Sequence, residues 1–295
     1  MKKRLYAYLL QIIEKLFGID CAKKIDTKLR FHRTLDLKNP KTLADKVSYI
    51  ELHCQSPLAP KCTDKYEVRS YVKGKGLEEI LVPVVGGPWT SFEEIDFAKL
   101  PDRFVLKATH GCKMNYFVKS KSELNIQECR QEVNKWLKTT YGTYSMEPHY
   151  KKIPHRIYAE KYLDDMSKMV DYKFFCFNGK PKYVHVISNR CILENGAMAC
   201  TMDLFDMNWN SVVGICGLGT EVPGDGAIKK PETFNQMQTI AATLSSGFDF
   251  VRVDLYEGNS TVLFGEMTFT PACGVFPYFT EDLLKTMGEK LIVNR

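Results

Sequence analysis

Two carboxylates near the end of the chain lie in neighbouring runs of residues with strand character. Asp254 follows the run "FVRV", and Glu266 follows the run "TVLFG". The stretch "EGNS" between the runs predicts a turn, so we expect them to pair as an antiparallel hairpin. Twelve positions separate the two acids, and an even separation allows both side chains to lie on one face of the hairpin.

Two interpretations of this acidic pair are open. Carboxylates at close range repel each other unless a cation lies between them. Asp254, Glu266 and the hydroxyl of Thr268 would supply the oxygen ligands that Mg²⁺ prefers, completed by the phosphates of a substrate. Alternatively, each acid pairs with a nearby Lys or Arg. The hairpin alone does not decide between them.

Basic residues also occur inside strand-like runs. Lys107 ends the run "RFVLK", and Lys173 is enclosed by "DYKFFCF". Arg190 follows "VHVIS", and Arg252 precedes Asp254 by two positions. A lysine in a buried strand needs an anion, and the loop "ATHGCK" can offer backbone N–H groups to phosphate. Four cations and two acids on one face would suit Mg²⁺ bound to a nucleoside triphosphate.

The elements that must position these residues have a mixed pattern. Residues 1–95 favour helices, including "NPKTLADKVSYIELH" and "TDKYEVRSYVKGKG", the second beginning at Thr63 or Asp64. From about residue 101, strands are expected at "RFVLKATHG", "NYFV", "RIYAEKYL", "YKFFCF", "KYVHVIS", "FDFVRVDLY" and "STVLFGEMTFT". Further helices are expected at "NIQECRQEVNKWLKTTY", "PETFNQMQTIAATLSS" and "TEDLLKTMGEKLIV", and loops at 189–200 and 214–230. The sequence therefore predicts an α+β fold with antiparallel sheets.

Composition excludes several classes of protein. A hydrophobic content of 44%, a charged content of 26% and the lack of eighteen consecutive apolar residues indicate a globular chain without a membrane-spanning helix. A net charge of +6 suits anionic partners, but no run of basic and aromatic residues indicates nucleic acid. Ten cysteines occur without a CxxC pair, which favours a reducing compartment, the cytoplasm, over a zinc site.

The first twenty residues, "MKKRLYAYLLQIIEKLFGID", imitate a signal peptide. Gln11, Glu14 and Lys15 interrupt the apolar stretch, so an amphipathic helix is the better interpretation. Its apolar positions recur at helical spacing: Leu5, Leu9, Ile12, Ile13 and Leu16. This helix either docks on the body of the protein or contacts a membrane surface, and the sequence leaves both open.

The order of the motifs resembles a known superfamily. The series "VLK", "AEKYL", "DYKFF", "VRVD" and "GEMTFTP" resembles ATP-grasp proteins, in which two α+β lobes clamp ATP. More narrowly, "NPKTLADKV", "DKYEVRSYV", "KATHG", "DYKFFCFNGKPKYV" and "EMTFTPACG" resemble the TupA-like branch, associated with teichuronopeptide and surface-polysaccharide biosynthesis. The resemblance implies a helical region at 1–98 for acceptor binding, a small lobe at 99–165 and a large lobe with the Mg²⁺-binding hairpin at 166–295.

The resemblance assigns phosphate and adenine contacts. Lys107 would hold the α- and β-phosphates beneath a mobile loop containing His110 and Gly111, although that loop lacks the second glycine often found in relatives. Lys173 would also lie near the phosphates. The adenine would be recognised by the strand joining the lobes, through Glu160, Lys161 and Leu163, with the Glu160 carbonyl and the Leu163 N–H as the contacts.

The resemblance also assigns the groups around the ribose and the reacting centre. Asp171 would lie near the ribose. The metal ligands would be Asp254, Glu266 and Thr268, the last standing where many relatives have Asn. The catalytic cations that face the transferred charge would be Arg252, Arg190 and Lys173.

These assignments imply an ATP- and Mg²⁺-dependent ligase that joins a carboxylate to an amine. The acid would be a uronic acid of a surface glycan or its precursor, and the amine an amino acid or amino alcohol. Basic residues such as Lys65 and Arg69 in the N-terminal region could bind an anionic acceptor. The alternatives are a glycosyltransferase, although Asp164 and Asp165 do not form its DxD motif, a sugar phosphotransferase, and a nucleotide-binding protein without catalysis.

Overall fold

The computed structural model describes residues 2–142, 146–164, 169–258 and 261–294. The chain divides into two compact units, a larger one of residues 1–57, 144–147 and 167–295, and a smaller one of residues 58–143 and 148–166. The N-terminal 57 residues thus pack with the C-terminal region, whereas we predicted one N-terminal region at 1–98. The functional division into 1–98, 99–165 and 166–295 stays a prediction.

The smaller unit is built on a four-stranded antiparallel sheet with the strand order β1-β4-β2-β3. Its strands are β1 (Val84–Trp89), β2 (Phe104–Ala108), β3 (Asn115–Val118) and β4 (Ile157–Lys161). Its helices are α4 (Ala59–Thr63), α5 (Val68–Gly74) and α6 (Ile126–Leu137), with short turns at Glu78–Ile80, Phe92–Glu94, Lys121–Glu123 and Pro148–Lys152. The apolar side of α6, with Cys129, Val133 and Trp136, packs on the sheet in one buried cluster.

The larger unit contains a six-stranded sheet with the order β10-β9-β5-β6-β7-β8, antiparallel except for β7 and β8. Its strands are β5 (Asp171–Phe177), β6 (Lys180–Ile192), β7 (Met198–Asp206), β8 (Glu221–Pro223), β9 (Phe250–Gly258) and β10 (Thr261–Thr268). Its helices are α1 (Lys2–Phe17), α2 (Ile19–Phe31), α3 (Leu43–Tyr49), α7 (Phe234–Ser245) and α8 (Glu281–Lys290), with a π-helical turn at Ile50–Cys54 and a 3-10 turn at Pro271–Gly274. Among the described residues, no helix is both long and apolar enough to cross a bilayer.

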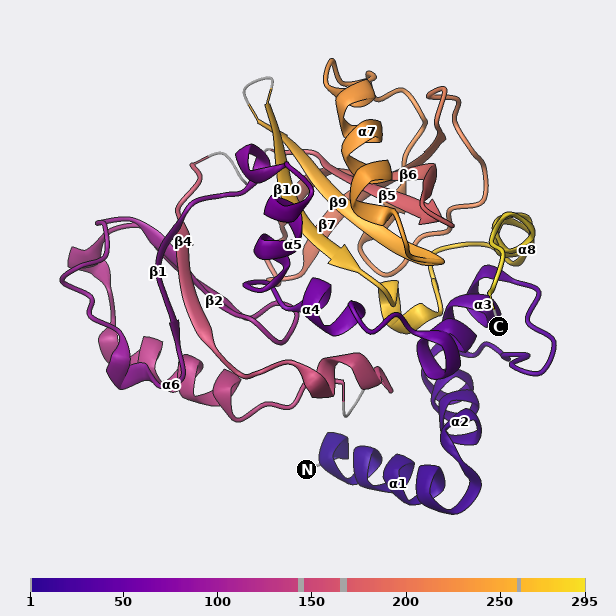
Figure 1. Cartoon of the computed structure of the whole chain (residues 1–295), viewed down its shortest axis with the longest axis horizontal. Coiled ribbons are helices and arrows are strands. Elements are labelled where there is room, and N and C mark those ends of the chain that lie inside the picture. The colour runs from indigo at the N-terminus through magenta and orange to yellow at the C-terminus, as the bar shows by residue number, and fades with distance from the viewer. Residues whose placement is uncertain (1, 143–145, 165–168, 259–260, 295) are drawn as a thin grey trace. The chain divides into compact units, whose positions relative to one another are not determined.

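The two faces of the larger sheet differ in character. Helix α7 packs on one face (Figure 1), where the rings of Phe174 and Phe234 stack 5.8 Å apart. The other face is apolar at one end, where Phe175 and Phe177 join residues of α3 and α8 in a buried cluster. Residues two positions apart on a strand lie on the same face. The charged residues of β5 and β9 therefore continue this apolar face toward the opposite end of the strands.

The α+β prediction is confirmed, and most predicted elements lie where expected. A hairpin around Asn178 joins β5 to β6. The predicted loop at 189–200 is wrong, because β6 continues to Ile192 and β7 begins at Met198. The helix expected from Thr63 or Asp64 begins instead at Val68. Gly18, with a φ of 86°, ends α1 and allows a second helix, α2, that the sequence did not indicate.

Candidate active site

The predicted metal and phosphate residues of the larger unit form a row across three strands. Lys173 on β5 pairs with Asp254 on β9, and Asp254 pairs with Glu266 on β10. In the adjacent row, Arg252 pairs with Thr268. Directly opposite residues in a sheet project to the same face, so five residues from three separate stretches of sequence meet at one place. The predicted hairpin, with its two acids opposite each other, is confirmed.

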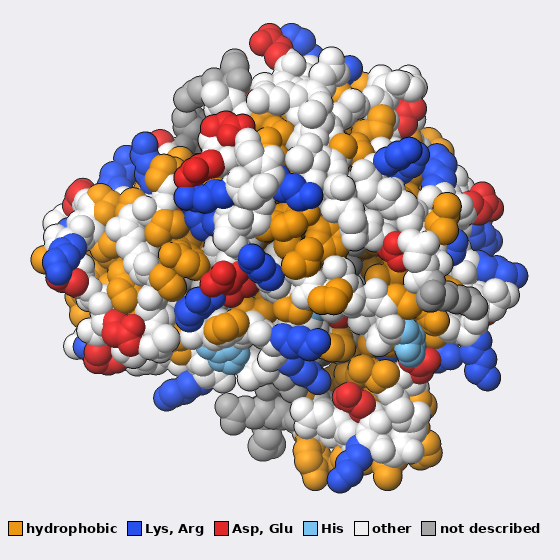
Figure 2. Space-filling view, viewed as in Figure 1, with side chains coloured by type: hydrophobic (Ala, Val, Ile, Leu, Met, Phe, Trp, Pro, Cys, Tyr) orange, Lys and Arg blue, Asp and Glu red, His pale blue; other side chains and the backbone are white. Residues whose placement is uncertain are grey.

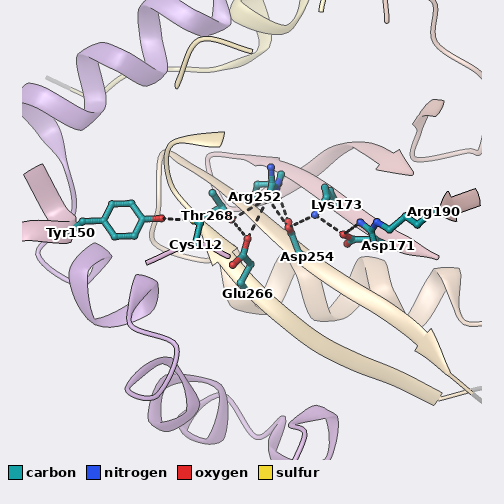
Figure 3. A network of polar contacts seen from close by, with 9 residues as sticks. All are labelled: Cys112, Tyr150, Asp171, Lys173, Arg190, Arg252, Asp254, Glu266 and Thr268. Atoms are coloured by element: carbon teal, nitrogen blue, oxygen red, sulfur yellow. Dashed lines mark hydrogen bonds and ion pairs between the residues drawn. The ribbon is translucent and has the colours of Figure 1, made fainter. Parts of the chain in front are cut away.

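The guanidinium of Arg252 lies at the centre of the three predicted metal ligands (Figure 3). Its Nε donates to Asp254 Oδ1 and its Nη2 to Asp254 Oδ2, each at 2.6 Å. The same Nη2 donates to Thr268 Oγ1 at 3.2 Å and lies 3.5 Å from Glu266 Oε1. The Thr268 hydroxyl in turn donates to Glu266 Oε1 at 3.1 Å. All three predicted ligands therefore converge on one positively charged nitrogen.

Lys173 extends this cluster into a chain of alternating charges. Its Nζ lies 2.7 Å from Asp254 Oδ2 and 2.6 Å from Asp171 Oδ2. Arg190, from the far end of β6, reaches the same Asp171 oxygen at 2.6 Å. Figure 3 shows the order Arg190, Asp171, Lys173, Asp254 and Arg252 along the network. Each buried charge is thus satisfied by a partner, as a buried ion pair requires.

The protonation states follow from burial and from these partners. Burial alone would lower the pKa of the Lys173 ammonium, but Asp171 and Asp254 raise that pKa above its ordinary value. Burial raises the pKa of the Asp171 carboxyl, but Lys173 and Arg190 more than reverse this, so its pKa lies below the usual range. Burial raises the pKa of Asp254, against the opposing effects of Arg252 and Lys173. Lys173 is therefore a fixed cation at neutral pH, suited to binding phosphate.

The donor set fits a divalent cation. Among the described residues, no three His, Cys, Asp or Glu side chains are grouped to hold a metal without further ligands. Two carboxylates and a hydroxyl match the way Mg²⁺ is commonly bound, with substrate phosphates and water completing its shell. The guanidinium nitrogen marks a point where these oxygens already surround positive charge. A bound Mg²⁺ would neutralise the phosphates and orient them for in-line transfer.

His185 is a neighbour of this cluster that the sequence analysis did not single out. It pairs with Lys173 across β5 and β6, is 3% exposed, and stacks on Tyr278 with ring centroids 5.2 Å apart. Neither ring nitrogen has a hydrogen-bond partner among the described residues. Burial, followed by the charges of Lys173 and Arg252, lowers the pKa of His185 to about 3. The only signal in the sequence was its alternation with apolar residues in "KYVHVIS".

The smaller unit holds the predicted phosphate lysine in a different polar group. Lys107 Nζ lies 2.5 Å from Glu160 Oε2, while Glu160 Oε1 accepts from Tyr158 Oη at 3.1 Å and from Arg69 Nη1 at 3.4 Å. The anion that a strand lysine needs is therefore supplied by Glu160. We predicted only the carbonyl of Glu160 as a contact, so its carboxylate is an addition to the site. A phosphate bound by Lys107 would share the ammonium with Glu160.

The other predicted residues of the smaller unit differ in their accessibility. Lys161 ends β4 with an exposed side chain, and Leu163 follows two residues later. His110 is fully buried: its ring stacks on His155 at 4.0 Å, and its Nε2 lies 2.9 Å from the Trp136 carbonyl oxygen. Burial lowers the pKa of His110 to about 4. The ring of His110 therefore packs inside the smaller unit, and the assignment of His110 and Gly111 to a mobile loop that covers the phosphates stays a prediction.

Comparison with known proteins identifies the family. The model of the TupA-like ATP-grasp family matches residues 45–292, so the chain belongs to that family, and the predicted fold family is confirmed. A comparison with curated proteins gave no match.

Several solved structures are similar to this chain at low sequence identity. An L-amino acid ligase from Bacillus licheniformis is 14% identical over 87% of this chain and 56% of its own, with a TM-score of 0.46. A D-alanine--D-alanine ligase from Bacillus anthracis is 16% identical over 71% of this chain and 57% of its own, with a TM-score of 0.44. The corresponding ligase from Helicobacter pylori is 13% identical over 84% and 69%, also with a TM-score of 0.44. This chain spans little more than half of the first two proteins.

Proposed function

We propose that this protein is an ATP- and Mg²⁺-dependent ligase that joins a carboxylate to an amine through an acyl-phosphate. The observation that carries the proposal is the row of Lys173, Asp254 and Glu266 with Arg252 against it, because it gathers fixed cations and oxygen ligands on one sheet face. Membership of an ATP-grasp family supports the same conclusion.

The reaction has two steps, phosphoryl transfer and amide formation, and negative charge must be neutralised in each. A carboxylate oxygen of the acid attacks the γ-phosphorus, and the bond from that phosphorus to ADP breaks. The amine nitrogen then attacks the acyl carbon, phosphate leaves with the bonding electrons, and the nitrogen loses a proton to form the amide. Lys173, Arg190 and Arg252 would neutralise the charge that develops on the transferred group. Asp254, Glu266 and Thr268 would hold Mg²⁺.

The nucleotide contacts that the family resemblance implies are also part of the proposal. In the proposal, Lys107 contacts the α- and β-phosphates, and the backbone at Gly111 covers them. The stretch 160–163 recognises adenine through the Glu160 carbonyl and the Leu163 N–H, with Lys161 alongside. Asp171 faces the ribose. It already accepts from Lys173 and Arg190, so these two cations would fix the orientation of its carboxylate.

The proposed acid is a uronic acid on a surface polysaccharide or its precursor, and the proposed amine is an amino acid or amino alcohol. This choice is supported by the TupA-like branch to which the chain belongs. We further propose that the reaction takes place in the cytoplasm, at the inner face of the membrane, where ATP and glycan precursors are both available.

The test is to supply ATP, Mg²⁺ and pairs of a uronic acid and an amine, and to measure ADP and the mass of the product. Asp254→Asn and Glu266→Gln should each reduce ADP formation by about a hundredfold or more. Glu257→Gln is the matched control on the same hairpin, because its carboxylate accepts from Thr233 outside the network. Tight ATP binding with no ADP formed from any pair would exclude ligation, and phosphate retained on the sugar would identify a phosphotransferase.

A further inference from the structure

Helix α1 carries apolar side chains on two sides, and the residues that the structure describes cover only one of them. Leu10 is buried against Ala22 of α2 and Met146, with Tyr6 and Ile13 packed around them. A second set of apolar residues is between 37% and 67% exposed: Leu5, Tyr8, Leu9, Ile12 and Leu16. These five have the i, i+3, i+4, i+7 and i+11 spacing of a single helix face. We call this set the α1 stripe.

The α1 stripe is continuous rather than a scatter of single residues. At about 100° per residue, its members fall within an arc of about 100°. Figure 2 shows hydrophobic side chains at the surface over α1, at the lower edge of the view. Isolated exposed apolar residues need no explanation, but a contiguous row on one helix indicates a surface that binds another apolar phase or partner.

The charge of this region selects the partner. Helix α1 contains four Lys and Arg against one acid, an excess of three, whereas the whole chain has an excess of six. Exposed Lys15 borders the α1 stripe, and the only acid of α1, Glu14, lies on the opposite side of the helix. An apolar helix face bordered by basic residues is the arrangement of helices that lie in the plane of a membrane with anionic lipids.

We propose that α1 docks the protein on an anionic membrane surface, with the α1 stripe inserted among the lipid chains and basic residues facing the headgroups. The same helix remains attached to α2 through Leu10, so the rest of the larger unit would be held at the bilayer. This inference does not depend on the ligase reaction, because it concerns a surface remote in sequence from Asp254 and Glu266.

The test uses the full chain and co-sedimentation with two kinds of vesicle, mixed phosphatidylglycerol and phosphatidylcholine or phosphatidylcholine alone. Wild type should bind the mixed vesicles at least about tenfold more tightly than the neutral ones. The double variant Leu9→Gln and Ile12→Gln should lose about tenfold or more of that affinity. Lys15→Glu should weaken binding to the mixed vesicles about fivefold or more and leave the weak binding to neutral vesicles unchanged.

The matched control is Val213→Gln with Ile292→Gln, two exposed apolar residues elsewhere in the larger unit, which should bind vesicles as wild type does. An unchanged unfolding midpoint would show that the stripe variant is folded. Equal sedimentation of wild type and the stripe variant would overturn the proposal. So would a concentration-dependent dimer that the stripe variant abolishes, because a second copy would then cover the stripe.

Discussion

Arg252 holds together, through one guanidinium, the groups that we propose to bind Mg²⁺. Its Nη2 contacts Asp254, Glu266 and Thr268, so a metal ion at this point and the guanidinium in its present place exclude each other. If Mg²⁺ binds, the guanidinium must turn away from these oxygens. It would then be free to face the phosphoryl group, so metal binding would release the arginine that we propose to be catalytic.

Arg252→Met tests this exchange. Without the guanidinium, Asp254 keeps only Lys173, and Glu266 loses its nearby cation, so the folded state should lose about 3 kcal/mol of stability in the absence of metal. Mg²⁺ should restore part of this loss, since it can replace the missing charge. The measurement is thermal unfolding with increasing MgCl₂ and no nucleotide, in which the variant should gain more from Mg²⁺ than wild type gains.

Arg190→Met is the matched control for this experiment. Arg190 pairs with Asp171 and touches none of the three predicted metal ligands in the contacts that the structure describes. Its loss should lower stability without creating a response to Mg²⁺. Equal Mg²⁺ responses of the two variants would show that the cation does not take the place of Arg252.

At the scale of the elements, one irregularity in the pairing of β9 and β10 decides which face of the sheet Glu266 lies on. The pairs from Thr261 opposite Gly258 to Phe264 opposite Leu255 would continue with residue 265 opposite Asp254. A register shift at Gly265 instead places Glu266 opposite Asp254. Such a bulge moves the following residue to the other face of the sheet. Without it, Glu266 would face away from Asp254 and Lys173.

Gly265→Ala should disturb this arrangement. An added Cβ would lie 2.9 Å from the carbonyl oxygen of Asp254 and 2.8 Å from a ring carbon of Tyr256, and the backbone oxygen cannot give way without moving Asp254. We expect a loss of about 1–3 kcal/mol in unfolding free energy by denaturant titration, together with loss of any Mg²⁺ effect on stability.

Gly74→Ala provides the control, because nothing lies within 4 Å of an added Cβ at the end of α5. It should be neutral or stabilising by up to about 1 kcal/mol. If Gly265→Ala were as stable and as responsive to Mg²⁺ as this control, the bulge would not be what positions Glu266.

The same hairpin shows how far sequence reasoning extends. The alternation of apolar residues and the turn residues predicted the strands, and the even separation predicted that the acids face each other. The even separation predicted the right pairing, but the reasoning was incomplete. Paired residues near the turn are separated by an odd number of positions, and the bulge at Gly265 shifts the pairing by one residue so that Glu266 lies opposite Asp254. A bulge depends on cross-strand packing, which one strand's pattern does not reveal. The burial of His110 was missed for a similar reason, since its partners His155 and Trp136 are distant in sequence.

For the whole molecule, the basic N-terminal segment has a structural role that the sequence did not indicate. Lys46 donates to the carbonyl oxygens of Gly288 and Leu291 at the end of α8, at 2.8 and 2.7 Å. Lys23 donates to the Cys273 carbonyl at 2.8 Å, and Arg33 donates to the Val275 carbonyl at 3.3 Å. These cations satisfy carbonyl groups of the C-terminal region. The expectation that Lys65 and Arg69 bind an anionic acceptor stays a prediction.

Burial lowers the pKa of one histidine in each unit, His185 and His110, and this makes stability depend on pH. The pKa is about 3 for His185 in the larger unit and about 4 for His110 in the smaller unit, both below the ordinary value of 6.5. The unfolded chain therefore binds protons that the folded chain does not between about pH 6.5 and these values. By linkage, stability is greatest above pH 6.5 and falls as the pH is lowered through this window. At pH 5, each histidine should cost about 2 kcal/mol relative to pH 7.

His185→Phe tests how much one of these histidines contributes to the loss of stability at acidic pH. Phenylalanine can keep the stacking on Tyr278 and leaves no unpaired ring nitrogen in the core, so stability at pH 7 should change little. At pH 5, the variant should be about 2 kcal/mol more stable than wild type, measured as unfolding free energies in urea at both pH values. His32→Asn is the control, at an exposed helix end with a φ of 55° that Asn tolerates. It should lose as much stability as wild type between pH 7 and 5. If His185→Phe loses as much stability as wild type between pH 7 and 5, the proton is taken up by another group. Protonation of His185 would then not be what destabilises the folded protein at acidic pH.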